Sequence, residues 1–339
     1  MFNQVDITLG EWLIMQSDNI YVYRAYTESI LNYSCDALDT QHSAGLFHKD
    51  TYGNFEARAL NGDNEGFVER ASFAAGSRQF ELLGHLHSDL FYQNKLLVNG
   101  INLNVKLTRN KDSFCLINGD AEQYKLVILS ASLFVNRVKV SQSVRLAHAE
   151  ALQLLNANYA VERVALKICS IPTGTRLTQQ QNLFPGQLPK LIIIECVDNS
   201  AFSGLYTSKP FNFKHYDINY AVLVHEGAVI PSNPCTLSFG TGNFIREYLG
   251  LVSTTGKHMR DPGVVVSREG YGAGYTLFAF NLTPIMEDGD HCNLLKNGNL
   301  KSEIPFSQPL ATNMNMIVFS VFNGVIQINH TCQIMFDYL

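Results

Sequence analysis

The sequence predicts an all-β protein made of two tandem copies of one strand-rich module. Short segments of alternating apolar and polar residues recur along most of the chain, with turn residues between them. Several of these phrases occur twice, in the same order, in the two halves. Only 16% of the 339 residues are charged and 46% are hydrophobic, with 21 Phe and 15 Tyr. Aromatic and β-branched residues suit half-buried pleated sheets, so the composition agrees with the strand pattern.

The first half contains four stretches with strand character. Residues 4–14 alternate around a Gly break, which predicts a hairpin. Residues 96–109 carry an Asn-Gly pair between alternating positions, and this pair is the strongest short hairpin signal. The segment 124–140 is long and rich in β-branched residues, and 161–172 alternates until it ends at a proline. We therefore expect strands in all four.

The second half continues this pattern, and a few short helices interrupt the strands. Ala and Leu at helical spacing predict a helix over 143–158, with Ser141 or Ser143 as its N-cap. Two shorter helices are predicted over 23–33 and 244–252. The predicted strand regions of the second half are 186–199, 211–231, 274–284, 299–306 and 313–329.

The repeated phrases define the domain organisation. The matched pairs, in chain order, are 3–14 with 218–231, 23–31 with 245–252, the Asn-Gly pairs at 99–100 and 297–298, and 125–140 with 315–329. A repeat of this length indicates a duplicated domain, because solenoid units are much shorter. An eight-stranded jelly roll closes such a strand-rich copy economically into two packed sheets. The predicted fold is therefore a double jelly roll with a few short helices.

The two copies are unequal at their starts. The second copy has a strand-rich lead-in, residues 182–206, before its first matched segment, and the first copy has none. We expect a first jelly roll over 1–172 that lacks its opening strands, and a second over 173–339. A sandwich without those strands exposes unpaired sheet edge and apolar surface.

Composition and charge argue against several functional classes. The net charge is −5 and the pI about 6.1, with no run of Lys or Arg, so direct nucleic-acid binding is not expected. No apolar run reaches the length of a membrane helix, and the first residues do not resemble a secretory signal. Seven irregularly spaced cysteines without a CxxC motif predict buried free thiols in a reducing compartment.

Three short motifs deserve comparison with known kinds of site. His85, His87 and Asp89 match a His-x-His metal pattern, but no companion ligands are evident, and a polar strand face is the favoured interpretation. Residues 250–258 fail as a phosphate loop, because five residues separate the glycines and a His takes the hydroxyl position. Residues 270–274 are Gly-rich but precede a strand, which predicts a loop.

None of these motifs predicts a functional site. We find no GxSxG elbow and no paired-carboxylate motif. The sequence therefore predicts no catalytic, cofactor-binding or metal-binding residue, and no enzyme activity.

Two further pairs of residues carry structural expectations. Arg24 and Arg246 recur at matching positions beside Tyr26 and Tyr248. We expect each Arg to tie its short helix to neighbouring carbonyls or a carboxylate; the alternative is a solvated helix face. Phe211 and Phe213 fall on one side of a predicted strand, which indicates packing, and such aromatics can also anchor subunit interfaces.

Several stretches together resemble one protein family. They are YVYRAYTESILNYSCDA, LLGHLHSDLFYQNKLLVNG, FPGQLPKLIIIECVDNSAFSG, KPFNFKHYDINYAVLVHEG, GYTLFAFNLTP and VFNGVIQINHTCQIMFDY. In combination they resemble the double-jelly-roll major capsid proteins of Polinton (Maverick) elements and adintoviruses. The resemblance covers nearly the whole chain. Family members usually begin further upstream, with the first strands of the first jelly roll, and that run is missing here.

The resemblance implies a structural role by assembly. Two jelly rolls would stand side by side, three chains would form a pseudo-hexagonal homotrimeric capsomer, and capsomers would tile an icosahedral shell around double-stranded DNA. The implied partners are further copies of the chain and penton or minor capsid proteins. The implied location is the virion, assembled inside the host cell and not secreted, and no cofactor is implied.

Two other interpretations stay open. The chain could be an eroded or host-domesticated endogenous copy that forms no particle, which the short start favours. It could also be a ligand-binding or enzymatic pair of β-sandwiches, which would need a concave site lined with aromatic side chains and carboxylates.

Overall fold

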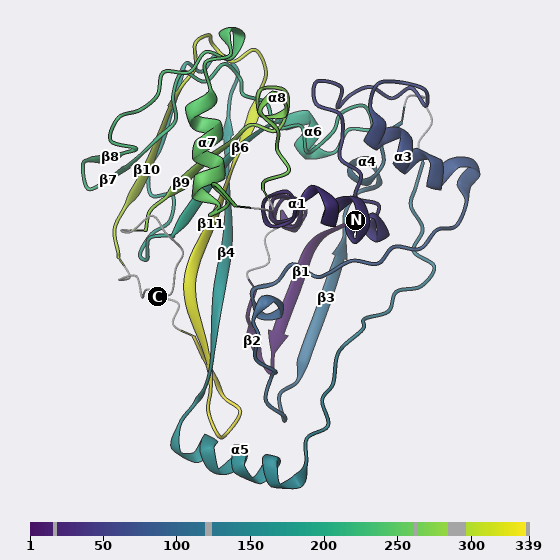
Figure 1. Ribbon diagram of the computed structural model, residues 1–339, viewed down its shortest axis with the longest axis vertical. Coiled ribbons are helices and arrows are strands. Elements are labelled where there is room, and N and C mark those ends of the chain that lie inside the picture. Colours follow the sequence, from purple (N-terminus) through teal and green to yellow (C-terminus); the bar gives the residue numbers. More distant parts are fainter. Residues whose placement is uncertain (16–18, 119–123, 261–262, 284–295, 337–339) are drawn as a thin grey trace.

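The computed structural model describes residues 1–15, 19–118, 124–260, 263–283 and 296–336. Antiparallel sheets form the framework of these ranges, with short helices between the strands (Figure 1). The α-helices are α1 (Tyr21–Asn32), α2 (Cys35–Thr40), α3 (Glu65–Ala74), α4 (Asp112–Cys115), α5 (Gln142–Leu154), α6 (Asn199–Ser203), α7 (Ile245–Thr254) and α8 (Arg268–Gly272). The 3-10 turns are η1 (His42–Gly45), η2 (Ala75–Ser77), η3 (Asp89–Tyr92) and η4 (Phe239–Thr241).

The second half of the chain folds into a two-sheet sandwich, which we call the second unit. One sheet has the order β4-β11-β6-β9, and β12 extends the far end of β11. The other sheet has the order β5-β10-β7-β8. The strands are β4 (Ala157–Ile171), β5 (Leu177–Gln180), β6 (Leu191–Asp198), β7 (Val222–His225), β8 (Ala228–Ile230), β9 (Leu277–Asn281), β10 (Leu300–Pro305), β11 (Met314–Ile328) and β12 (Ile334–Phe336).

This strand order is that of a jelly roll. Numbered along the unit, one sheet holds the first, eighth, third and sixth strands, and the other holds the second, seventh, fourth and fifth. The central strand β11 pairs with β4 along its whole length and with β6 from Met314 to Val321. Its first nine residues are all buried, since neighbours cover both edges and both faces.

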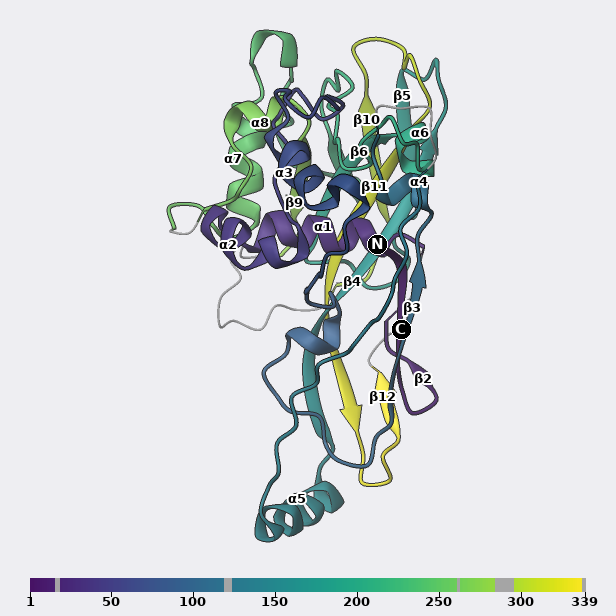
Figure 2. The ribbon, with the colours of Figure 1, turned by 90° about the vertical axis from the view of Figure 1, so that its right-hand side faces the viewer.

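The first half forms a smaller sheet in the order β2-β1-β3, from β1 (Phe2–Leu9), β2 (Trp12–Leu13) and β3 (Leu103–Arg109). This order reproduces β8-β7-β10 of the second unit: a tight hairpin whose first strand also pairs with a distant strand. The apolar face of β1 packs against the lower ends of β4 and β11 (Figures 1 and 2). The repeat seen in the sequence is therefore a repeat of structure in these segments.

The segment 124–140 departs from its prediction. It was expected as a long strand matching β11, but it forms no ladder with any described residue, and its backbone runs unpaired towards α5 (Figure 1). The strand expectation is wrong for this stretch because a strand needs hydrogen-bonded neighbours, whatever its propensity.

Two other local predictions also need correction. The Asn99-Gly100 pair does make a turn, with Gly100 at φ +93°, but residues 96–98 form no strand and β3 pairs with β1 instead. The stretch containing His87 is likewise no strand and leads into the 3-10 turn η3.

The domain boundary after residue 172 stays a prediction, and the sheet pairing suggests where to move it. β4 ends at Ile171 and pairs with β11 from end to end. This pairing favours Ala157 as the start of the second unit.

The remaining general expectations concern membranes and thiols. Within the described ranges, no helix combines the length and apolar character needed to cross a membrane. The cysteines of the described ranges are all free, but only Cys169 and Cys196 are buried, while Cys35 and Cys332 are exposed. Cys292 lies outside the described residues.

Candidate functional site: an exposed arm and a polar seam

An exposed apolar stretch, residues 124–155, is the most unusual surface of the molecule; we call it the arm. It consists of the unpaired segment 124–140 and helix α5. Its large apolar residues are strongly exposed, with Leu129 at 70%, Phe134 at 82% and Leu154 at 84%. Contiguous exposed apolar surface on a folded protein marks a place where another surface packs.

Helix α5 is a surface helix at one end of the molecule. Ser141 caps its N-terminus by accepting a hydrogen bond from the Val144 amide, as one of the two predicted caps. None of its residues is buried, and it lies at the far end of the molecule from α7 (Figures 1 and 2). Its apolar residues Val144, Leu146 and Leu154 are exposed, and Leu152 is half-buried.

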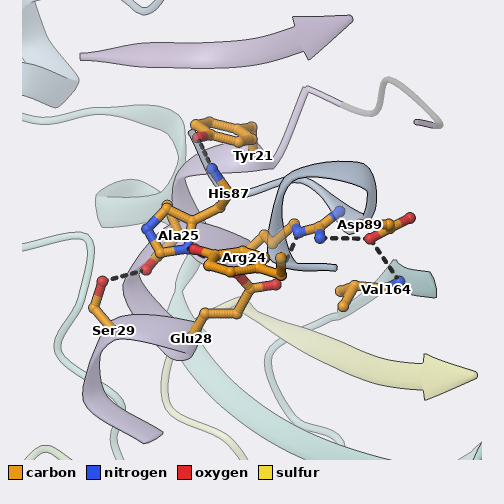
Figure 3. Close-up of polar contacts among 9 residues, drawn as sticks. Tyr21, Arg24, Ala25, Glu28, Ser29, His87, Asp89 and Val164 are labelled. Carbon is orange, nitrogen blue, oxygen red and sulfur yellow. Dashed lines mark hydrogen bonds and ion pairs between the residues drawn. The ribbon is translucent and has the colours of Figure 1, made fainter. Parts of the chain in front are cut away.

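The first half and the second unit meet along a row of buried polar contacts, which we call the polar seam. Its centre is Arg24 in α1 (Figure 3). Arg24 Nε donates to Glu28 Oε1 at 2.9 Å, and Arg24 Nη2 donates to Asp89 Oδ1 at 2.5 Å. The backbone N–H of Val164, in β4, donates to the same Asp89 oxygen at 3.2 Å. A side chain from η3 is thus fixed by both a first-half helix and a second-unit strand.

A histidine completes the centre of the seam. His87 Nδ1 lies 2.6 Å from Glu28 Oε2 and 2.9 Å from the Tyr92 hydroxyl, and its backbone N–H donates to the Tyr21 hydroxyl (Figure 3). Burial alone would raise the pKa of the Glu28 carboxyl, but His87 and Arg24 lower it below its usual value. Glu28 is therefore a buried anion held by two donors.

The polar seam contains two further contacts, and the first of them joins α1 to β6. Thr27 Oγ1, in α1, donates to Glu195 Oε1, in β6, at 2.5 Å. Glu195 is fully buried, and burial raises the pKa of its carboxyl to about 8, against a smaller lowering by the Thr27 hydrogen bond. At neutral pH it is mostly the uncharged acid.

The second of these contacts is an ion cluster around Asp50. Lys209 Nζ lies 2.8 Å from Asp50 Oδ2, and Arg70 in α3 pairs with the other oxygen. Burial would raise the pKa of Asp50, but Lys209 and Arg70 lower it. Lys209 belongs to the second half, so this cluster also joins the halves.

The three residues of the predicted His-x-His pattern differ in their burial. His87 and Asp89 are buried in the polar seam, whereas His85 is exposed, so the three residues do not share one polar face. No cluster of three or more potential metal ligands occurs in the described ranges. The signal that could have identified the seam is the Arg24–Glu28 spacing, which places both side chains on one helix face.

The prediction for the two arginines is confirmed for Arg24 and wrong for Arg246. Arg246 in α7 is exposed, and its guanidinium makes no hydrogen bond or ion pair with the residues that the structure describes. The position matching Glu28 is Gly250, so Arg246 has no carboxylate at the i+4 position on its own helix face, and the neighbouring Glu247 projects from a different face.

The aromatic prediction is confirmed as packing. Phe213 is fully buried, and the ring of Phe211 stacks on Tyr26 at a centroid distance of 4.2 Å. The prediction of a loop over 270–274 is only partly correct, because helix α8 continues as far as Gly272. Residues 250–258 contain the C-terminal end of helix α7, which agrees with the prediction that this stretch is not a phosphate loop.

A surface hollow lies where the halves meet, and it offers little chemistry for a ligand. Its volume is about 340 Å³, and Phe55 and Tyr216 are its aromatic residues. Its lining in the described chain includes Lys214 and His215 but no carboxylate. It therefore lacks the paired carboxylates that glycoside hydrolysis requires.

Comparisons with known proteins point to the fold. No family model matches the chain. An uncharacterized protein of Caenorhabditis elegans is 23% identical over 334 residues, which cover 95% of this chain and 76% of that protein. A chain in the cryo-EM structure of the Sputnik virophage superposes with a TM-score of 0.52 at 12% identity, over 99% of this chain and 74% of that one. The chain thus spans about three quarters of both matches.

Two looser structural matches are the PBCV-1 virus capsid and the mavirus major capsid protein. The PBCV-1 match has a TM-score of 0.44 at 10% identity and covers 100% of this chain and 83% of that one. The mavirus match has a TM-score of 0.31 at 11% identity and covers 54% of this chain and 41% of that one. The fold assignment rests on the Sputnik match. The chain is mostly β-sheet with few short helices, and its fold matches that of double-jelly-roll capsid proteins.

Proposed function

We propose that this chain is a structural capsid subunit that acts by associating with copies of itself. The observation that carries the proposal is the superposition on the Sputnik virophage chain along 99% of this chain. The jelly-roll strand order of the second unit supports it independently of sequence identity. No chemistry is assigned to any residue, and the proposed role is not enzymatic.

The finer form of the proposal is a homotrimeric, pseudo-hexagonal capsomer. Two jelly-roll modules in each of three chains give six similar modules around one axis, which is why a duplicated domain suits a six-sided tile. We propose a place in the virion of a double-stranded DNA virus or virus-like transposon of the Polinton, Maverick or adintovirus kind. Penton or minor capsid proteins would be further partners, and assembly would occur inside the host cell.

The test is the oligomeric state of the purified chain. Sedimentation velocity over a concentration series, followed by electron microscopy, should reveal trimers and six-sided tiles. A monomer that stays monodisperse at every concentration would contradict the proposal.

A second candidate function is favoured by the exposed arm. An eroded or domesticated copy that forms no particle would also carry unpaired apolar surface, because selection for assembly would have been lost. Monomers or amorphous aggregates at every concentration, without trimers, would favour this alternative.

A further inference from the structure

The ion cluster around Asp50 holds an amine and a carboxamide on one carboxylate. Lys209 Nζ lies 2.8 Å from Asp50 Oδ2, and Asn64 Nδ2 donates to Asp50 Oδ1 at 3.1 Å. The exposed fractions are 3% for Asp50, 1% for Asn64 and 8% for Lys209. A lysine amine is a nucleophile once it loses its proton, and a neighbouring carboxylate can take that proton. The cluster therefore contains a nucleophile from the second half, an acyl group from the first half, and a base between them.

The carbonyl group of Asn64 is polarised for nucleophilic attack. Its Oδ1 accepts hydrogen bonds from the backbone N–H of Thr51 at 3.2 Å and from that of Phe67 at 3.4 Å. Asn64 is also the N-cap of α3, so the positive end of the helix dipole lies at the same oxygen. Two backbone donors on one carbonyl oxygen stabilise the oxyanion that forms when an amide is attacked. The amide nitrogen faces Asp50 instead, where it can receive protons.

The surroundings of the amine are apolar and favour its neutral form. Lys209 Nζ lies 5.9 Å from the centroid of the Phe211 ring. The hydroxyl of Tyr275, a fully buried residue, donates to the backbone carbonyl of Asp50 at 2.9 Å. Burial lowers the pKa of the Lys209 amine, and the Arg70 guanidinium lowers it further, against a rise caused by Asp50. The unprotonated amine is therefore reached at a lower pH than in a solvated lysine.

We propose that Lys209 and Asn64 become joined by an isopeptide bond. Nζ attacks Asn64 Cγ, the new C–N bond forms, and the bond from Cγ to Nδ2 breaks. Nζ loses two of its three protons through Asp50, and the departing nitrogen gains two and leaves as ammonium. Nothing is oxidised or reduced, and no cofactor or second protein takes part.

The bond is a covalent link across the polar seam. It connects the N-cap of α3 in the first half to the segment that follows α6 in the second unit. The ion pairs of the seam weaken with salt and pH, whereas an amide bond does not. The inference goes beyond the proposed capsid function and does not depend on it, because the link lies within one chain.

Mass spectrometry of the intact chain, denatured and reduced, tests the proposal. The parent should be lighter than its sequence mass by one ammonia, and a digest should contain a branched peptide that joins Asn64 to Lys209. Lys209→Arg keeps a cation beside Asp50 but removes the amine, so it should have its full sequence mass. Lys49→Arg is the matched control, because Lys49 donates to the carbonyl of Val265. It should keep the ammonia loss.

Cleavage of the arm gives a second readout that needs no variant. Trypsin can cut at Arg137, Lys139 or Arg145, which are all exposed and lie between the two linked residues. In denaturant with reductant, the two fragments of the parent should stay joined. Fragments that separate, from a folded parent that keeps its full sequence mass after prolonged incubation, would overturn the proposal. An ammonia loss without the branched peptide would also overturn it, since a succinimide at Asn64 has the same mass.

Discussion

The two halves of this chain contain matching sequence segments but fold into different structures. The second unit pairs all eight strands of its jelly roll, and its core contains fully buried residues such as Ile194 and Ile317. Among its described residues, the first half forms three strands, whose partners lie within it, and its counterpart of β11 stays unpaired. The comparison teaches that an apolar, β-branched run becomes a strand only where neighbours can satisfy its backbone.

The same comparison holds for the two repeated helices. α1 carries a buried ion network at the polar seam, whereas α7 presents Arg246 to solvent. At the matched position α1 has Glu28 and α7 has Gly250, and Arg24 has a second carboxylate partner in Asp89. Substitutions at matched positions of the two halves test these differences.

The largest expected effect is that of Arg24→Ala. It leaves Glu28 and Asp89 buried without their cation, and breaking a buried pair in this way costs about 3–5 kcal/mol. Arg246→Ala, the matched change in α7, should stay within about 0.5 kcal/mol because it alters an exposed side chain. Urea unfolding of both variants gives the two values, and equal losses would contradict the asymmetry between the helices.

A core truncation compares β11 with the arm directly. Ile317→Ala should cost about 2–5 kcal/mol, since it opens a cavity in the buried core on the face of β11 that it shares with Glu195. Val127→Ala, at the matched position of the arm, should change the free energy of unfolding by no more than about 0.5 kcal/mol. Thermal denaturation measures both, and a large loss for Val127→Ala would mean that the arm is packed in solution.

The pH dependence of stability should contain a contribution from Glu195. Its pKa rises from 4.5 to about 8 on folding, so between these values the folded carboxyl keeps a proton that the unfolded one releases. Stability from this group is complete below pH 4.5, falls by up to about 1.4 kcal/mol per pH unit, and is lost by about pH 8.

Glu195→Gln removes this titration while keeping the size of the side chain. The difference in unfolding free energy between Glu195→Gln and the parent should therefore change with pH across that window, in favour of the variant as pH rises. Carboxylates with lowered pKa values, such as Glu28 and Asp50, cancel in this difference. A difference that is constant from pH 5 to 8 would show that Glu195 titrates normally.

The smallest effect concerns α7. Gly250→Glu restores the carboxylate that α1 has at Glu28, and an added Cβ at Gly250 meets nothing within 4 Å. We expect a gain of about 1 kcal/mol from helix propensity and roughly 0.3–0.5 kcal/mol more from an ion pair with Arg246. Gly250→Ala isolates the first term, so chemical denaturation of the two variants should differ only by the pair, and the difference should vanish at high salt.

Sequence patterns were enough to predict most strands of the second unit, though not β5 or β12, together with the hairpin of β1 and β2, the helices α1, α5 and α7, and the duplication that relates the halves. These follow from alternation, turn residues, helical spacing and capping, which act over a few neighbouring residues. The Arg24–Glu28 pair was also accessible, because i,i+4 spacing is local.

Only the tertiary structure decided that 124–140 has no ladder, that His87 and Asp89 are buried beside Arg24, and that Glu195 faces Thr27 across the polar seam. Each of these features depends on which distant segment packs beside the residue. Local sequence therefore does not predict whether a strand finds a partner or whether a charged side chain is buried. The arm and β11 have the same kind of sequence, and the presence or absence of β4 and β6 beside them makes one a buried strand and leaves the other exposed.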